Sequence, residues 1–308
     1  MIAKRIKPLL ANLISPEQTG FVEGRQILDG LVVTQEVIHT IKEKKQKGMM
    51  IKLDLSKAYD RLNWKYLKRV LESFGFNNRW VDWVLSMIST PNFSILINGI
   101  PSTPFNASRG IRQGDPLSPF LFILAAEGLG RFFKKEQRER RIKGLKLWGS
   151  NIPITHQQFV DDIMLFCEAT VKEVKGIKRI LDTFMEASGM EVNKEKSCTF
   201  VFNTLDSVKA HLTRTLGFRQ GELPTTYLGN QIDFHPTRMV NWLQVIEKIK
   251  NKMAGWAFRT LNIAGRIVLV KSVLQAIPIY PLSIIAAPKG ACSKIKELYT
   301  KFIWGGPN

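Results

Sequence analysis

The sequence predicts an α+β fold in which an antiparallel sheet is flanked by helices. Residues 158–167 form two apolar runs on either side of Asp161-Asp162, a pattern typical of a tight β-hairpin with acids at its tip. Residues 49–55 predict a buried strand, and residues 191–202 predict another. Between these stretches, apolar residues recur at helical spacing.

The charge balance points to a polyanionic partner. The 308 residues contain 45 Lys plus Arg against 26 Asp plus Glu, a net charge of +19. Nucleic acid is the commonest partner of so basic a chain. A membrane partner is not expected, because the longest apolar stretch, Ala276 to Pro288, is short and broken by prolines.

The cysteines bear on the compartment. Cys167, Cys198 and Cys292 lie far apart, without zinc spacing or an even framework, and no signal peptide is convincing. We therefore expect reduced thiols in an intracellular protein, in the nucleus or the cytoplasm. The oligomeric state is left open.

The first 48 residues predict helices around a loop. A basic helix-like segment is broken at Ser15-Pro16-Glu17, and a loop runs from Gln18 to Arg25. Apolar residues from Ile27 to Ile41 then recur at helical spacing, and the charged run 42–47 is interpreted as a solvated helix end.

The strand at residues 49–55 carries Asp54 near its end. An acid inside so apolar a run is the first candidate partner for the hairpin acids, although an edge-strand Asp facing water is equally compatible. Asn63 is expected to cap the next helix and Gly75 to end it. Residues 93–108 predict a hairpin with Asn98-Gly99 in its connection.

A loop rich in Gly, Arg and Gln spans Arg109 to Pro119, ahead of an apolar helix. Glycine lets a ligand approach the backbone, and a helix start offers N–H groups to phosphate. We expect Ser118 to cap this helix and Pro119 to take its first position. A plain loop is the alternative.

The paired acids Asp161 and Asp162 carry the chemistry. Two adjacent carboxylates repel each other unless a cation lies between them or one is protonated. Magnesium takes oxygen ligands of this kind, so the tip is a plausible half of a two-metal site. An ordinary acidic turn is the alternative for an isolated Asp-Asp pair.

Beyond the hairpin, Thr170 and Glu173 predict a capping box that opens a helix ending at Gly189. A further β-return is expected through residues 227–229. Residues 236–308 hold eleven Lys or Arg against two acids and predict a basic helical region suited to a duplex backbone.

Taken together, these stretches resemble the reverse transcriptase of non-LTR (LINE-type) retrotransposons, closest to the type abundant in plant genomes. The similarity spans nearly the whole chain, and the order and spacing of its motifs are what make it specific. The matching stretches are Gln18 to Arg25, Ile51 to Asp60, Arg109 to Leu124, Phe159 to Asp162, Gly189 to Ser197, Leu223-Pro224 with Tyr227 to Gly229, Ala264 to Arg266, Lys271 to Leu274 and Phe302 to Trp304. The chain departs from relatives at Val160, where Ala is usual, and at the polar pair Gln157-Gln158.

The resemblance implies a right-hand architecture of fingers, palm and thumb. Residues 1–48 would be part of the fingers, 49–235 the palm with a fingers insertion, and 236–308 a basic thumb-like region. It also implies an RNA-directed DNA polymerase that uses an RNA template, a DNA primer and dNTP.

The resemblance also implies roles for single residues. Asp54, Asp161 and Asp162, with the backbone carbonyl of Leu55, would hold two Mg²⁺ ions, with Mn²⁺ as a possible substitute. Four further contacts would serve the nucleotide or template. They are Tyr59 under the incoming sugar, Gln113 with Gly114 beside the nucleotide and template, Arg25 at the triphosphate or template, and Lys196 as proton donor to pyrophosphate.

Two other interpretations stay open at this stage. The family's earliest fingers motifs would lie before Met1, which predicts a fragment of a larger polyprotein and allows an inactive nucleic-acid-binding remnant. A different template-copying enzyme is the other alternative, either an intron-type reverse transcriptase or an RNA replicase. Replicases typically carry Gly where this chain has Val160.

Overall fold

The computed structural model describes residues 1–150, 152–256 and 261–305. The chain divides into two compact units, Met1–Gly221 and Glu222–Asn308. The predicted domain limits at 48 and 235 stay predictions, since this division is by compactness and carries no functional assignment.

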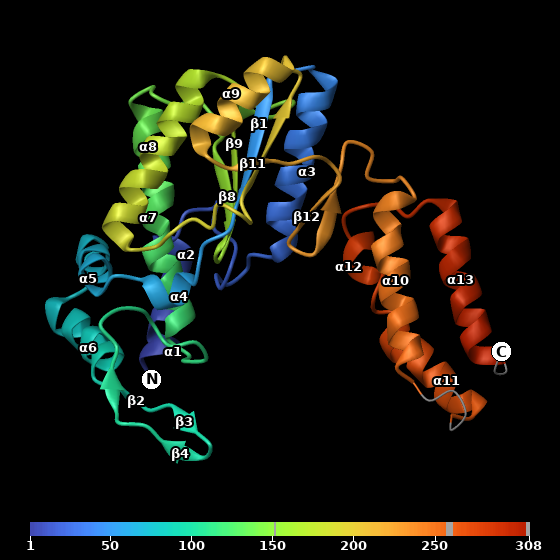
Figure 1. Ribbon diagram of the computed structural model, residues 1–308, viewed down its shortest axis with the longest axis horizontal. Coiled ribbons are helices and arrows are strands. Elements are labelled where there is room, and N and C mark those ends of the chain that lie inside the picture. The colour runs from blue at the N-terminus through green and yellow to red at the C-terminus, as the bar shows by residue number, and fades with distance from the viewer. Residues whose placement is uncertain (151, 257–260, 306–308) are drawn as a thin grey trace. The chain divides into compact units, whose positions relative to one another are not determined.

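A five-stranded sheet organises the first unit, with strand order β11-β10-β1-β9-β8 (Figure 1). All neighbouring strands run antiparallel except β10 and β11, which are parallel. The strands are β1 (Gly48–Leu53), β8 (His156–Phe159), β9 (Asp162–Glu168), β10 (Cys198–Phe202) and β11 (Arg219–Gln220). The antiparallel sheet expected from the sequence is confirmed. The third predicted strand is shorter than residues 191–202, because Val192 makes only an isolated bridge with Leu55 before β10 begins.

Helices cover both faces of this sheet. Alternate residues of β1 and β9, among them Met49, Ile51, Ile163 and Leu165, pack into one core with the helices on that face. The helix α3 lies across the sheet from them (Figure 1). The helices of the unit are α1 (Ile2–Ile6), η1 (Lys7–Leu9), α2 (Leu10–Leu13), α3 (Ile27–Glu43), α4 (Ala58–Arg61), α5 (Trp64–Ser73), α6 (Asn78–Ser89), α7 (Ser118–Arg138), α8 (Val171–Ser188) and α9 (Asp206–Leu216).

Local capping explains where several helices begin. The Asn63 side chain accepts hydrogen bonds from the N–H groups of Lys65 and Tyr66, so its predicted cap of α5 is confirmed. Thr170 caps α8 and Gly189 ends it at φ +73°, as expected. The reciprocal half of the predicted capping box is wrong. The Glu173 carboxylate instead accepts from the N–H groups of Lys143 and Gly144, and so ties α8 to the preceding connection.

The start of α7 differs from expectation. Ser118 is the first helical residue and makes no capping hydrogen bond, and Pro119 is therefore the second. Asp115 supplies the contact instead, because its Oδ1 accepts from the N–H of Leu117 at 2.8 Å. Ser118 lies inside the helix, whereas a side-chain oxygen must lie before the helix to reach the N–H groups at its start. Asp115 is in that position, three residues before Ser118.

Small strand pairs complete the first unit. The predicted hairpin at 93–108 forms as two short pairs, and Asn98 and Gly99 both adopt positive φ at its turn, as a two-residue hairpin requires. The pairs are β2 (Asn92–Phe93) with β5 (Phe105–Asn106), β3 (Leu96–Ile97) with β4 (Ile100–Pro101), and β6 (Leu145–Lys146) with β7 (Pro153–Ile154).

One close approach fixes α5 against α7. The Tyr66 hydroxyl donates to the Ala125 carbonyl at 2.8 Å. Its place beside α7 depends on Gly128, because a Cβ there would overlap the hydroxyl oxygen. The ring of Tyr66 also meets Phe184 of α8 edge-on, with centroids 6.3 Å apart. These contacts hold three helices together behind the sheet.

The second unit is mainly helical. Its core contains Trp242 and Ile249 of α10 against Ala291 and Phe302 of α13. The predicted β-return is confirmed, with Leu228 and Gly229 at its turn, both at positive φ. The elements are β12 (Thr225–Tyr227), β13 (Asn230–Ile232), α10 (Val240–Ala254), α11 (Ile263–Leu269), η2 (Val270–Leu274), α12 (Ile279–Leu282) and α13 (Lys289–Trp304).

Candidate active site

The three candidate acids lie at adjacent strand ends. β1 pairs antiparallel with β9 up to Leu53 and Ile163, so Asp54, the first residue after β1, comes level with Asp162. β8 and β9 close through Val160 and Asp161, with Phe159 opposite Asp162. The tip therefore differs slightly from the predicted one, because it is made by Val160 and Asp161, and Asp162 already belongs to β9.

The charges of these acids act on one another. Burial raises the pKa of Asp162, and the charges of Asp161 and Asp54 raise it further, against the opposing charge of Lys52. Asp54 and Asp162 are 108 positions apart in the chain, so only the sheet register brings their charges together. The structure therefore brings the charges of Asp161 and Asp54 within reach of Asp162, and it adds Lys52 as a cation that the sequence did not single out.

The backbone around Asp54 is fixed from the opposite side. The N–H of Asp54 donates to Ser197 Oγ at 3.1 Å, and the Asp54 carbonyl accepts from the N–H of Asn193 at 2.8 Å. The N–H of Ser56 donates to the Glu191 carbonyl. These backbone hydrogen bonds form the isolated bridge between Leu55 and Val192, and the Leu55 carbonyl is not one of their acceptors. The exposed Lys196 lies in the loop between Asn193 and Ser197, so that loop brings it next to a residue bonded to Asp54.

Tyr59 lies close to the acids. Its ring stacks on Phe122 of α7, with centroids 4.9 Å apart and planes 7° apart. Burial, followed by the charge of Asp161, raises the pKa of Tyr59 to about 12. The phenol is therefore neutral at physiological pH, and Phe122 holds its ring in one orientation beside the acidic turn.

The loop with Gln113 and Gly114 is anchored beside Tyr59. The N–H of Ile111 donates to the Tyr59 carbonyl at 2.9 Å, and the Gly110 carbonyl accepts from the Trp64 indole at 2.6 Å. Gly110 has φ +88°, and a Cβ there would lie 2.6 Å from the Asp60 carbonyl oxygen. The loop can dock only because residue 110 is glycine. Gln113 and Gly114 lie in the exposed part of this loop.

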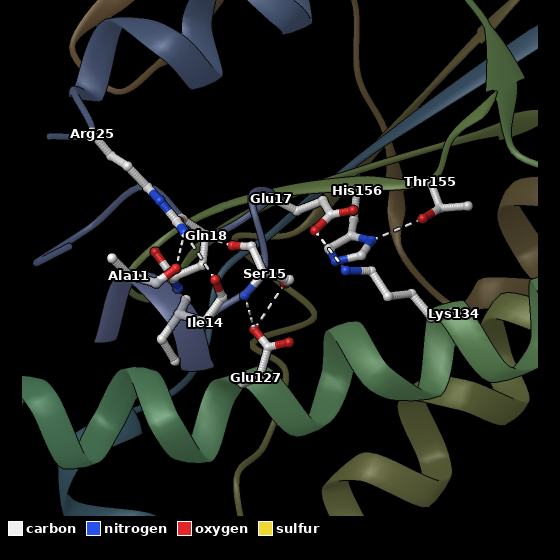
Figure 2. Close-up of polar contacts among 10 residues, drawn as sticks. All are labelled: Ala11, Ile14, Ser15, Glu17, Gln18, Arg25, Glu127, Lys134, Thr155 and His156. Carbon is white, nitrogen blue, oxygen red and sulfur yellow. Dashed lines mark hydrogen bonds and ion pairs between the residues drawn. The ribbon is translucent and has the colours of Figure 1, made fainter. Parts of the chain in front are cut away.

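Arg25 is placed differently from the other candidates. Its guanidinium donates to the carbonyls of Ser15, Gln18 and Ile14 at 2.5, 2.6 and 2.8 Å, with a longer contact to Ala11. Figure 2 shows this side chain pointing into the turn formed by those residues. The structure gives Arg25 a role in shaping its own loop. The predicted contact with a triphosphate or template stays a prediction.

The same loop is tied to α7 by charged groups (Figure 2). Glu127 Oε2 accepts from the N–H and the hydroxyl of Ser15 at 3.1 and 2.8 Å. Lys134 donates to Glu17 at 3.0 Å. Both lie near His156, which is fully buried and whose Nδ1 lies 2.8 Å from the Thr155 hydroxyl. Burial lowers the pKa of His156 to about 4, so the ring is neutral near pH 7. A cavity of about 860 Å³ opens beside this cluster, lined in part by Arg25, Glu127 and Lys134.

Sequence reasoning missed a residue outside the hairpin that contacts the acidic turn. Gln18 Oε1 accepts from the N–H of Val160 at 3.0 Å. Gln18 was part of a motif that the sequence singled out, but its partner lies 142 residues away. In the structure, the burial of the polar Gln18 side chain, which is only 1% exposed, marks this contact. The sequence alone does not reveal that burial.

The described residues do not form a ready-made set of metal ligands. Within the described ranges, no three His, Cys, Asp or Glu side chains are gathered as metal ligands. The donor chemistry nevertheless fits a hard divalent cation, since the charges of Asp161 and Asp54 raise the pKa of Asp162, and neighbouring carboxylates are stabilised by a cation between them. Nor is any helix in the described part of the chain long and apolar enough to cross a membrane.

Solved structures share this fold. The telomerase of Candida tropicalis, solved with a fragment of telomeric RNA, aligns with 97% of this chain and 46% of its own, at 14% identity and a TM-score of 0.55. The telomerase of Candida albicans aligns with 97% of this chain and 50% of its own, at 11% identity and a TM-score of 0.52. The fold is that of the right-hand polymerases.

Sequence comparison gives the family. The chain belongs to the family described as reverse transcriptase (RNA-dependent DNA polymerase), which matches residues 1–232. It is 24% identical over 310 residues to a 149 kDa protein of transposon TX1 from Xenopus laevis, covering 99% of this chain and 23% of that protein. It is 25% identical over 321 residues to the Pol polyprotein of the type-2 retrotransposable element R2DM from Drosophila melanogaster, covering 98% of this chain and 29% of that protein.

These matches confirm the resemblance to a non-LTR reverse transcriptase domain. The chain spans about a quarter of the length of these two relatives. The expected likeness to plant elements is a finer statement that these matches do not address. Reverse transcriptase domains generally use divalent metal ions.

Proposed function

We propose that this chain copies an RNA template into DNA by adding deoxynucleotides to a primer 3′-hydroxyl. The observation that carries the proposal is the convergence of Asp54, Asp161 and Asp162 at neighbouring strand ends of a reverse transcriptase fold. Family membership supports a role of these acids in polymerisation, whereas paired acids alone serve many chemistries.

In this proposal, the carboxylates of Asp54, Asp161 and Asp162 and the carbonyl of Leu55 hold two Mg²⁺ ions. When bound, the ions supply the positive charge that activates the 3′-hydroxyl and stabilises the departing pyrophosphate. The chain's own contribution is to place several oxygens together at fixed strand ends and to balance them with Lys52. Mn²⁺ is expected to substitute, because it also takes oxygen ligands.

Three contacts would orient the nucleotide. Tyr59, held flat against Phe122, would underlie the sugar and exclude a 2′-hydroxyl. Gln113 and Gly114 would flank the base and the template from the docked loop. Lys196 would give a proton to pyrophosphate, and its loop already reaches the backbone of Asp54 through Ser197.

The nucleic-acid partners follow from charge and family. An RNA template and a DNA primer carry the phosphates that a chain of net charge +19 would neutralise. A telomerase of the same fold was solved with RNA, which supports RNA as the template here. We place the protein inside the cell, where its three free cysteines would stay reduced.

Primer extension on the purified chain tests the proposal. A DNA primer on an RNA template should be extended with dNTP and Mg²⁺, and Asp161→Asn should abolish extension. A protein that binds the duplex without extending it, and whose binding Asp161→Asn leaves unchanged, would support the inactive-remnant alternative instead. Equal extension by ribonucleotides would favour an RNA replicase.

A further inference from the structure

Gln18 makes an unusual set of contacts for a side chain outside the hairpin. Its Oε1 accepts from the N–H of Val160 at 3.0 Å and from the N–H of Gly20 at 2.9 Å. Its Nε2 lies 3.4 Å from both the Val160 carbonyl and Gln158 Oε1. A buried amide costs free energy unless its polar atoms are paired. Here two of the four contacts are with the backbone of Val160 in the acidic turn.

Within that turn, Val160 has a backbone conformation that requires stabilising contacts. Its φ of +58° lies in the left-handed region, which a β-branched residue rarely adopts. Such a conformation persists where surrounding contacts over-determine it. Gln18 contacts both the N–H and the carbonyl of Val160, the residue that directly precedes Asp161.

Gly20 also packs against Val160, at a distance that leaves no room for a side chain. A Cβ at this position would lie 2.6 Å from Val160 Cγ2 and 2.9 Å from the Val160 nitrogen. The backbone of the loop therefore packs directly on the turn, without an intervening side chain. The contact is one of shape as well as hydrogen bonding.

The loop that carries Gln18 is itself anchored. The N–H of Gln158 donates to the Glu17 carbonyl at 2.8 Å, and the N–H of Thr19 donates to the Gln158 carbonyl at 2.9 Å, which aligns the loop alongside β8. Arg25 fixes the loop's carbonyls, and Glu127 and Lys134 tie it to α7 (Figure 2). Gln18 thus connects a rigid part of the unit to the turn.

We propose that Gln18 is a positioning residue that holds the backbone of Val160 so that Asp161 and Asp162 stay together at the strand ends. The need for it is electrostatic, because mutually repelling carboxylates favour any movement of the turn that separates them. The role of the turn in catalysis rests on the proposed polymerase function. The hold on the turn itself does not.

Two variants test the proposal from opposite sides. Gln18→Met keeps the volume and removes the hydrogen bonds, and Gly20→Ala keeps the hydrogen-bonding groups and displaces the turn. Gln157→Met is the matched control. Gln157 is also a buried glutamine, on the same strand as Gln158, and its Oε1 has no partner in the described part of the chain.

We expect both variants to change the catalytic rate and the Mg²⁺ requirement without changing the affinity for template–primer. Both variants should lower kcat for primer extension by roughly 10–100-fold, the size of effect that an ångström of misplacement produces. They should raise the Mg²⁺ concentration needed for half-maximal rate, with the affinity for template–primer unchanged. Gln157→Met should behave as the wild type in each assay. A loss of duplex affinity equal to the loss of kcat, or an equal effect of Gln157→Met, would overturn the proposal.

A readout without catalysis keeps this test apart from the polymerase assignment. Amide hydrogen exchange in peptides covering 158–165 should speed up in Gln18→Met and Gly20→Ala, while exchange in α8 stays unchanged. Mn²⁺ binding, followed by electron paramagnetic resonance, should weaken in the same two variants. An inactive wild type that still shows these differences would refute the polymerase function and keep the positioning role. Unchanged exchange at the turn in both variants would refute the positioning role, whatever the activity.

Discussion

Gln18 and Val160 are 142 residues apart in the chain, and the Gln18 amide oxygen accepts the Val160 N–H at 3.0 Å. The bond joins the loop before α3 to the turn between β8 and β9. The acidic turn is therefore not a free hairpin tip. Its geometry is a joint product of the sheet register and of a loop encoded near the start of the chain.

The ring of Tyr59 should control the choice of sugar. Tyr59→Ala is expected to admit ribonucleotides, raising their incorporation relative to deoxynucleotides by on the order of tenfold or more, the effect of about 1.4 kcal/mol. Tyr59→Phe keeps the ring on Phe122 and should keep the discrimination. The measurement is kcat/KM for matched dNTP and rNTP. Unchanged discrimination in Tyr59→Ala would show that the ring does not lie at the sugar.

Asp162 should favour activity at the expense of stability. Its pKa is raised in the fold, by burial first and then by Asp161, so folding favours its protonated form. The stability tied to this group is present below its unfolded pKa and is lost as pH rises through the folded pKa. Asp162→Asn should therefore raise Tm by about 1–3 °C at pH 7. The gain should vanish near pH 3.

The same variant should lower primer extension by at least roughly 10²–10³-fold, the loss typical of removing one preorganised electrostatic contact. Thermal unfolding against pH and single-turnover extension measure the two effects. A Tm that falls equally at both pH values would mean that Asp162 is held by contacts that its raised pKa does not reflect.

Gly110 should be one of the least replaceable glycines of the site. Gly110→Ala meets two costs, the positive φ and the overlap with the Asp60 carbonyl. Gly75→Ala is the matched control, because Gly75 has φ +83° and nothing within 4 Å of an added Cβ. We expect about 1–2 kcal/mol for Gly75→Ala and about 1–3 kcal/mol more for Gly110→Ala. Urea unfolding measures both, and equal losses would mean that the loop moves aside without cost.

The basic helices of the second unit should grip phosphates without reading bases. Lys248 and Lys252 of α10 and Lys289 and Lys296 of α13 are exposed, while the apolar faces of both helices are buried. Their joint replacement by Gln should weaken binding to unrelated template–primer sequences alike. It should also reduce the slope of log affinity against log salt by up to about 0.9 for each lysine that contacts B-form DNA. Parallel lines for wild type and variant would show that these charges only keep the helices solvated.

Local signals account for much of what the sequence predicted. The Asn63 cap, the Gly189 helix end and the Asn98-Gly99 turn each depend on residues within a few positions, so propensity decides them. The acids are candidates because a family motif marks them, and their catalytic role stays a prediction; the register of β1 and β9 does bring Asp54 level with Asp162.

Partners distant in sequence account for what could not be predicted. Glu173 suits a capping box locally, yet its carboxylate serves the N–H groups of Lys143 and Gly144, about thirty residues earlier in the chain. Arg25 in a motif suggests a ligand contact, and only the folded loop shows its guanidinium on backbone carbonyls. Gln18 belongs to a sequence motif, but no local signal marks its contact with the acidic turn, because that partner is set by tertiary structure.

The contact between Tyr66 and Gly128 imposes an order on evolutionary change. A methyl group at residue 128 collides with the Tyr66 hydroxyl and with little else, since the other atoms near it belong to the same ring. Tyr66→Phe removes the obstacle, at the cost of one hydrogen bond to Ala125. A lineage that gains alanine at 128, a better helix former than glycine, must therefore lose the hydroxyl first. The reverse order passes through an intermediate in which α5 is pushed away from α7, so only one of the two orders of substitution avoids a steric clash.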